Sequence, residues 1–374
     1  MKNIKKWLRW TPIYSLLLVG YVTFTLLDAF VIPHDTVKLS ELESAATDAV
    51  SAEEVSSDTK DDTASETGHK RGQGSSVVHA EGSSGKTHKK GEKPSGRPGK
   101  RHGDSESDGS HGKSSSDTST EENTTSEATT PTAGSDTYSA DGINITLTTK
   151  YVNDTWVYIA DVELSDTSAL KSGLAEDSFG RNISEKTSEI ASRLNAVLAI
   201  NGDYYGFRDT GYVIRNGYLY RSKTADEDQE DLVIYKDGTF EIIKESEITA
   251  EELLEKGALQ VYSFGPALVE DGKVSVTAGD EVDQSMSSNP RTAIGMVEAG
   301  HYVFVVSDGR TSESEGLSLA QLAEVMKDAG CTTAYNLDGG GSTTMYFKGE
   351  VVNNPTTNGN KISERSVSDI VYIG

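Results

Sequence analysis

A segment with few large apolar side chains most limits what this chain of 374 residues can fold into. Residues 36–136 are rich in Ser, Thr, Gly, Asp, Glu, Lys and His and poor in aromatic and large aliphatic residues. Such a segment cannot bury enough apolar surface to offset the loss of chain entropy on folding. We therefore expect a disordered, low-complexity stalk over 36–136 and one folded domain over 137–374, although the length alone allows two domains.

The first 35 residues have the pattern of a membrane anchor. Four basic residues come first: Lys2, Lys5, Lys6 and Arg9. Residues 10–32 then contain no Lys or Arg, which is close to the ~20 residues that span a bilayer. The basic flank predicts a cytoplasmic N-terminus and an extracellular C-terminal domain, on a single-pass protein of the cell membrane. A cleaved signal peptide is the alternative, but no A-x-A-like site follows the apolar run and Pro33 comes directly after it.

Charge and composition exclude several classes of function. The formal net charge of −24 argues against a nucleic-acid partner. The basic part of the stalk, residues 70–113, would permit contact with an anionic wall polymer or lipid headgroups, and a solvated spacer is the alternative. Cys331 is the single cysteine, so no intramolecular disulfide can form.

Familiar catalytic and metal-binding patterns are absent from the sequence of the domain. His301 is its one histidine, no G-x-S-x-G motif exists for a serine triad, and no Cys/His cluster could hold zinc. We expect no cofactor and no essential transition metal, and a supporting Ca²⁺ or Mg²⁺ ion stays open. The remaining chemistry uses carboxylates, which suit cleavage of a glycosidic bond, and arginines, which suit binding of a phosphate.

The domain pattern consists of many short strands and few helices. Alternation predicts strands over 143–149 and 156–164, and a helix is expected over 187–197. Hairpins are expected around Asn216-Gly217, Asp237-Gly238 and Asp271-Gly272. Two further helices are expected, with Thr249 and Ser318 as N-caps. The fold class is α+β, with a large, mixed and mostly antiparallel sheet.

Polar clusters follow the ends of several predicted strands. Asn201 and Asp203 belong to the first, and the most informative is the run Asn336 to Thr344, which contains Gly339, Gly340 and Gly341. Glycine lets a ligand approach the backbone, so N–H groups can point at an anion. No Lys-Ser/Thr pair follows, which excludes a P-loop, and a flexible hairpin turn is the structural alternative.

These motifs, taken in order, resemble the phosphodiester glycosidase family, some of whose bacterial members are associated with exopolysaccharide. The resemblance covers about residues 143–374 and rests on the segments 289–295, 308–310, 316–319, 336–345 and 364–367. It implies hydrolysis of a glycosyl-1-phosphodiester bond, which releases the sugar from phosphate. For an anchored protein with a Ser/Thr-rich stalk, a sugar-phosphate-bearing surface polymer or exopolysaccharide is the expected substrate.

We assign candidate roles on this basis. Asp203 and Asp338 are the candidates for the catalytic carboxylate, as nucleophile or general base, with Asp308 third. The groups expected to bind substrate are Asn201 and Asn336 on sugar hydroxyls; Arg291, Arg310 and Arg365 around the phosphate; Gly339, Gly340 and Gly341 through backbone N–H groups; and Thr292, Ser342 and Thr343 through hydroxyls. A non-catalytic module that binds anionic glycan is the competing interpretation, and such a module would tolerate loss of Asp203 or Asp338. A purely structural tether is the third, and it leaves the ordered motifs unexplained.

Overall fold

A computed structural model describes residues 15–25, 27, 34–39, 130–226, 228–276, 288–357 and 361–374. The predicted stalk lies almost wholly outside these ranges, as do parts of the predicted anchor. Residues 15–25 are helical, and among the described residues no helix is both long and apolar enough to cross a membrane.

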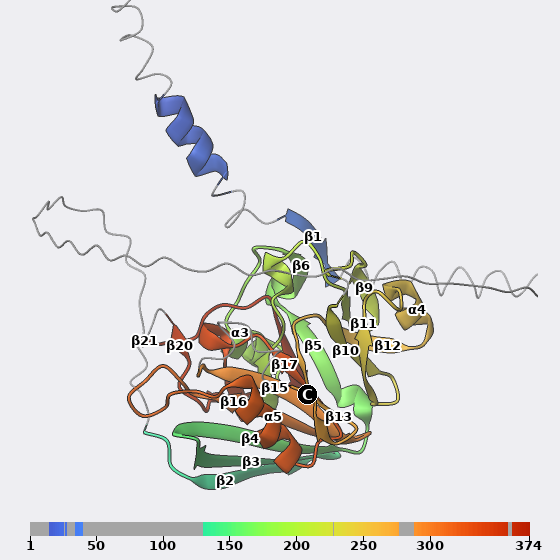
Figure 1. The fold of residues 1–374 in the computed structure, drawn as a ribbon, viewed down its shortest axis with the longest axis vertical. Helices are drawn as coiled ribbons and strands as arrows, with labels where there is room; N and C mark the ends of the chain where they lie inside the picture. The colour runs from blue at the N-terminus through green and yellow to red at the C-terminus, as the bar shows by residue number, and fades with distance from the viewer. Residues whose placement is uncertain are drawn as a thin grey trace, which may run out of the picture. The chain divides into compact units, whose positions relative to one another are not determined.

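Three antiparallel sheets make up most of the domain (Figure 1). The large sheet has eight strands, in the order β14 (Lys273–Val274), β13 (Ala267–Glu270), β17 (Thr333–Leu337), β15 (Arg291–Glu298), β16 (His301–Ser307), β4 (Thr155–Leu164), β3 (Ile143–Val152) and β2 (Gly134–Ala140). The second sheet has five, in the order β19 (Glu350–Val351), β18 (Met345–Phe347), β7 (Leu198–Asn201), β22 (Asp369–Ile373) and β5 (Leu170–Leu174). The third also has five, in the order β11 (Phe240–Lys244), β10 (Glu230–Tyr235), β12 (Ala258–Tyr262), β8 (Val213–Arg215) and β9 (Tyr218–Arg221).

Two short strand pairs complete the β-structure. They are β1 (His34–Lys38) with β6 (Ser178–Arg181), and β20 (Thr356–Thr357) with β21 (Lys361–Ile362). Every strand pairing recorded within the described ranges is antiparallel. The α+β class with few helices and mostly antiparallel strands is therefore confirmed, but the single large sheet that we expected is divided into three.

Each of three helices covers one sheet. They are α3 (Thr187–Arg193), α4 (Ala250–Glu255) and α5 (Leu319–Asp328), and the 3₁₀ turns are η1 (Thr167–Ala169), η2 (Ala175–Asp177), η3 (Tyr205–Phe207) and η4 (Gly340–Ser342). Leu322 and Met326 of α5 pack with Val303 of the large sheet, and Ile190 of α3 packs with Ile370 of the second sheet. The main apolar cluster contains residues of all three sheets, so a single core holds them together.

Turn and cap chemistry predicted from the sequence is confirmed in detail. Asn216 and Gly217 both have positive φ, 51° and 80°, and join β8 to β9 in the expected hairpin. Thr249 and Ser318 cap α4 and α5, each with a reciprocal capping box. The helix expected over 187–197 is wrong in length, because α3 ends at Arg193 and Asn195 takes a left-handed conformation with φ 54°.

Candidate active site

The ends of strands from two sheets meet at one place. Asn201 ends β7 of the second sheet, and Asp338 directly follows β17 of the large sheet. The Gly202 carbonyl accepts a hydrogen bond from the Asp338 amide at 3.3 Å, and Asn201 Nδ2 donates to the Asp338 carbonyl at 2.7 Å. Two polar clusters that lie far apart in the sequence are thereby joined, as expected for a site built by loops on rigid strands.

A cavity of about 320 Å³, called here the site cavity, opens at this junction. Four of the predicted site residues line it: Asp203, Asp338, Ser342 and Arg365. Tyr204 and Phe207 also line it, with their rings stacked at a centroid distance of 4.9 Å. The cavity therefore combines carboxylates, a guanidinium and an aromatic wall, which is a usual composition for a small-molecule site.

Asp338, Ser342 and Arg365 form a hydrogen-bonded chain on the cavity. Ser342 Oγ donates to Asp338 Oδ2 at 2.6 Å and accepts from Arg365 Nη2 at 2.7 Å, while Arg365 Nη2 lies 3.5 Å from Asp338 Oδ2. Burial raises the pKa of Asp338, while the Ser342 hydroxyl and the Arg365 charge lower it in part. The side chain of Asp338 keeps 14% of its surface exposed and that of Arg365 keeps 46%, so both groups remain accessible to a ligand.

The glycine run lies between two guanidinium groups. Gly340 has φ 63°, and a Cβ there would approach Arg310 Nη2 to 2.9 Å; a Cβ on Gly341 would meet Arg365 Nε at 3.4 Å. The Gly340 amide donates to the Pro290 carbonyl at 2.8 Å, so it is not available to the anion that we expected it to bind. Glycine suits Gly340 because of this positive φ, and it suits Gly339 because a Cβ there would approach the Pro290 carbonyl oxygen to 2.9 Å.

Asp203 lies in a separate, fully buried ion network. Its Oδ2 is 2.9 Å from Arg215 Nη2 and accepts from the Ser263 amide at 3.0 Å, while Oδ1 accepts from the Tyr205 amide at 2.9 Å. Arg215 Nε also contacts Asp369 Oδ2 at 2.7 Å, and none of these three charged side chains exposes more than 1% of its surface. Burial raises the pKa of Asp369 to about 7, against the lowering effect of Arg215. Asp203 borders the site cavity, but its carboxylate is occupied.

Several residues expected to bind sugar or phosphate lie beneath the cavity. Asn201 is fully buried: Oδ1 accepts from Thr292 Oγ1 at 2.9 Å and from the Thr344 amide at 3.3 Å, and Nδ2 donates to two carbonyls. Asn336 is also buried and donates from Nδ2 to the Gly265 carbonyl at 2.7 Å. Thr343 is fully buried. Asn201 thereby holds the loop that carries Asp338 and Ser342, whereas Asn336 Oδ1 and Thr343 Oγ1 are buried without a hydrogen-bond partner among the described residues.

Three predicted site residues do not line the site cavity: Arg291, Arg310 and Asp308. Arg291 is buried, and its Nε donates to the Leu317 carbonyl at 2.9 Å. Arg310 donates to Asn289 Oδ1 at 3.1 and 3.3 Å.

Asp308 borders another cavity, of about 240 Å³, together with Trp156 and Asn354. Its Oδ1 accepts from the Asn354 amide at 2.8 Å and its Oδ2 from Tyr158 Oη at 3.2 Å. Burial raises the pKa of Asp308 to about 6, and the hydrogen bonds from Asn354 oppose that shift.

Our reading of the sequence missed Arg215 and Asp369. The available signal was a single charged residue at the end of a short apolar strand, as with Asp369 at the start of β22 and Arg215 at the end of β8. A charge in such a run is buried, and a buried charge needs a partner of opposite sign.

The chain is similar in sequence to known proteins. Residues 194–374, which contain all of the candidate residues, match the family model described as phosphodiester glycosidase. The SPbeta prophage-derived uncharacterized protein YomE of Bacillus subtilis is 32% identical over 201 residues, 52% of this chain and 30% of that protein. N-acetylglucosamine-1-phosphodiester alpha-N-acetylglucosaminidase of Mus musculus is 27% identical over 176 residues, 42% of this chain and 33% of that protein.

The fold has a solved counterpart as well. The catalytic domain of zebrafish N-acetylglucosamine-1-phosphodiester alpha-N-acetylglucosaminidase superposes with a TM-score of 0.51 at 23% identity, and the match covers 65% of this chain and 86% of that one. The chain spans about a third of the length of the curated relatives named above. The resemblance predicted from the motifs is confirmed: residues 194–374 match the phosphodiester glycosidase family.

Proposed function

We propose that the site cavity hydrolyses a glycosyl-1-phosphodiester, with Asp338 as the catalytic carboxylate and Arg365 as a phosphate-binding group. The observation that carries the proposal is the Asp338–Ser342–Arg365 chain, which puts a carboxylate of raised pKa and an exposed guanidinium on one cavity wall. Carboxylates act on the anomeric carbon of a sugar, and guanidinium groups bind phosphate through paired N–H donors. One cavity therefore holds a group for each side of the bond that is cleaved.

The chemistry follows from the bond that breaks. The C1–O bond cleaves, the phosphate monoester leaves with the electron pair, and a water oxygen ends on C1. A phosphate monoester is a good leaving group, so the reaction needs little help from a general acid or a cofactor. A raised pKa makes Asp338 a stronger base or nucleophile towards C1 or the attacking water.

Arg365 is arranged to hold the leaving phosphate. Its contacts among the described residues use Nε and Nη2, towards Ser342 Oγ and the Gly339 carbonyl, and the Nη1 donors are not part of these contacts. The stacked rings of Tyr204 and Phe207 give the same cavity an apolar wall for a sugar ring. Arg310 donates to Asn289 and does not line the site cavity, so we assign the primary phosphate contact to Arg365.

The substrate that we propose is a cell-surface or exopolysaccharide-type polymer that carries sugar-1-phosphate. The motivation is the apolar N-terminal run with its basic flank and the Ser/Thr-rich segment before the domain, which together suit a protein held outside the cell membrane. Protease added to intact cells is expected to release the C-terminal domain. Complete protection of that domain would contradict this location.

The test of the activity is a substrate panel. The full-length protein is incubated with phosphodiesters of several sugar 1-phosphates, and free sugar and phosphate monoester are measured, with Asp338→Asn as the control. We expect release of both products in equal amounts from at least one substrate, and almost none with the variant. Binding of the glycans without any cleavage by the wild type would instead establish a non-catalytic binding module.

A further inference from the structure

A basic cleft lies beside the site cavity. It has a volume of about 470 Å³ and carries four cationic side chains against one acidic side chain, Asp209. The cationic residues are Arg181, Arg208, Arg221 and Lys223. The aromatic residues Phe179, Tyr205 and Tyr220 line the same cleft. In a chain with a net charge of −24, a cleft of this sign is an exception that calls for an anionic ligand.

The cleft and the site cavity share one wall. This wall is the segment 203–208, whose residues Tyr204 and Phe207 line the site cavity while Tyr205 and Arg208 line the basic cleft. The Arg208 guanidinium carbon lies 5.7 Å from the centroid of the Tyr204 ring, so a single cation–π contact connects the two openings. A ligand bound in the site cavity therefore has a second, cationic opening next to it.

Backbone contacts fix the cationic groups of the cleft. Arg221 Nη1 donates to the carbonyls of Tyr205 and Arg208 at 3.0 and 2.7 Å, and Arg208 Nη1 donates to the Ser263 carbonyl at 3.0 Å. Burial lowers the pKa of Arg221, the Asp203 carboxylate opposes that shift, and repulsion from Arg215 and Arg208 adds to it. The lining of the cleft carries three more cationic than acidic side chains, and an incoming anion would relieve the repulsion among them.

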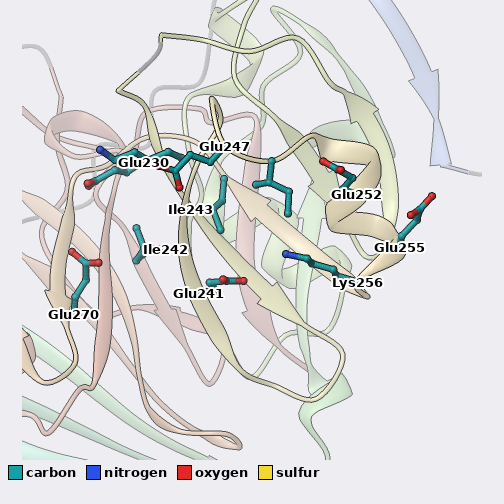
Figure 2. Close-up of a pocket in the computed structure, with 11 residues that line it drawn as sticks. Glu230, Glu241, Ile242, Ile243, Glu247, Glu252, Glu255, Lys256 and Glu270 are labelled. Carbon is teal, nitrogen blue, oxygen red and sulfur yellow. The ribbon is translucent and has the colours of Figure 1, made fainter. Parts of the chain in front are cut away.

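Another cavity, larger than the basic cleft, has the opposite character (Figure 2). It has a volume of about 690 Å³, lies against β10, β11 and α4, and is lined by six glutamates and two lysines. The glutamates are Glu230, Glu241, Glu247, Glu252, Glu255 and Glu270. This acidic cavity would repel a polyanion, so size alone does not identify where a charged polymer would run.

We infer that the basic cleft binds a second phosphate of a polymeric glycosyl phosphodiester whose cleaved linkage occupies the site cavity. This inference rests on the proposed function and adds its substrate class, a repeating sugar phosphate in place of a substrate with one phosphate. Lys223 and Arg181 supply the outer charges of the cleft, since Arg208 and Arg221 are held by the wall. Arg181 also pairs with Asp209 at 2.9 Å, so its substitution would remove an ion pair as well as a charge of the cleft. Lys223 is therefore the residue to substitute.

The experiment compares two substrates that differ in the number of phosphates. The full-length protein is assayed with the methyl phosphodiester of α-N-acetylglucosamine 1-phosphate and with a trimer of the same sugar joined through phosphodiesters. Wild type should show a kcat/KM about tenfold higher on the trimer, roughly the gain from one charge-assisted contact. Lys223→Gln should remove this advantage, leave the monomer unchanged and leave thermal melting unchanged.

Lys327→Gln is the matched control, because Lys327 lies on α5 and pairs with Glu324 at the surface. It should retain the full preference for the trimer. Raising the salt concentration should reduce the preference in wild type, since the outer charges are exposed to solvent. Equal kcat/KM for trimer and monomer in wild type, or equal behaviour of Lys223→Gln and Lys327→Gln, would overturn the inference while leaving the proposed function intact.

Calorimetric titration of Asp338→Asn with both compounds separates the two proposals. If wild type cleaves neither compound but the trimer binds tighter than the monomer, and Lys223→Gln abolishes that difference, the cleft stands as a polyanion site and the hydrolytic proposal fails for this sugar. If the two compounds bind with equal affinity, the second phosphate has no site and the inference fails.

Discussion

Two neighbouring groups of charged residues differ in how much of their side chains is exposed to solvent. Asp203, Arg215 and Asp369 form a network whose side chains expose no more than 1% of their surface. Asp338 and Arg365, joined through Ser342, expose 14% and 46%. Both groups contain an Asp–Arg contact, and the Gly202–Asp338 backbone hydrogen bond connects them. Residue type therefore does not separate a structural carboxylate from a catalytic candidate, whereas burial and the number of hydrogen-bond partners do.

The two groups differ in what neutralises their charges: buried partners within the protein for Asp203, and groups that face the site cavity for Asp338. Asp203 has an acceptor bond or ion pair at each oxygen, all within the protein, so a substrate would have to displace a buried partner. The Asp338 chain faces a cavity, where its partner Arg365 can exchange a weak contact for a phosphate. We accordingly expect substitutions in the buried network to change stability, and substitutions in the open chain to change turnover.

The largest effect on stability is expected for Arg215→Gln. The change leaves Asp203 and Asp369 buried without their cation, which costs about 3–5 kcal/mol of unfolding free energy. Urea unfolding followed by circular dichroism would measure it. Arg365→Gln is the matched control, and because Arg365 is nearly half exposed we expect it to unfold close to wild type. Similar unfolding midpoints for the two variants would break the distinction between the networks.

A smaller effect is expected from the pH dependence that Asp308 contributes. Its pKa in the folded protein is raised to about 6, above the ordinary value, because the carboxyl is buried. The unfolded chain gives up this proton at lower pH, so stability falls as the pH rises from about 4 to 6, by on the order of 2–3 kcal/mol in total.

Asp308→Asn removes this titration and keeps one acceptor oxygen, which can accept from the Asn354 amide, while its NH2 group can donate to Tyr158 Oη. The stability of the variant relative to wild type should therefore increase between pH 4 and pH 7, as measured by urea unfolding at each pH. A constant difference across that range would show that the fold does not raise the pKa of Asp308, which would contradict this expectation.

The smallest expected effect tests how tightly the loop is packed on the buried network. A Cβ at residue 202 would approach Asp369 Oδ1 to 2.3 Å, so Gly202→Ala should cost about 1–3 kcal/mol through overpacking. Gly349→Ala is a useful comparison, because its Cβ would meet nothing within 4 Å although its φ of 98° adds backbone strain. If thermal melting shows Gly202→Ala to be no worse than Gly349→Ala, the Asp369 carboxylate is free to move.

Local features of the fold could be predicted from sequence because their causes are local. The Asn216-Gly217 hairpin depends on two residues that tolerate positive φ, and the caps at Thr249 and Ser318 depend on side chains three residues apart. The strand β5 was not among the strands that we expected, and its Gly173 is a poor strand former. Gly173 is required there by packing, since a Cβ would lie 2.4 Å from Leu194 Cδ1.

The choice among the aspartates could not be predicted for the opposite reason. Asp203 and Asp338 both follow a buried strand and both stand beside glycine, so their local sequences are alike. They are distinguished by Arg215 and Asp369, which contact each other across 154 residues of sequence. Only the folded arrangement shows that the buried Arg215 pairs with Asp203, whereas Asp338 lines the site cavity. The same holds for Asn201, whose four contacts come from three separate loops or strands.

The most direct test compares Asp338→Asn with Asp203→Asn in the full-length protein, with thermal melting and turnover on a sugar-1-phosphodiester measured side by side. For Asp338→Asn we expect turnover to fall by about 10²–10⁴-fold, the usual range for loss of acid–base assistance, with melting close to wild type. For Asp203→Asn we expect a clear loss of stability, because its amide would face the donors of Arg215, Ser263 and Tyr205. Near-wild-type turnover in Asp338→Asn, or normal melting with abolished turnover in Asp203→Asn, would contradict the assignment of Asp338 as the catalytic carboxylate.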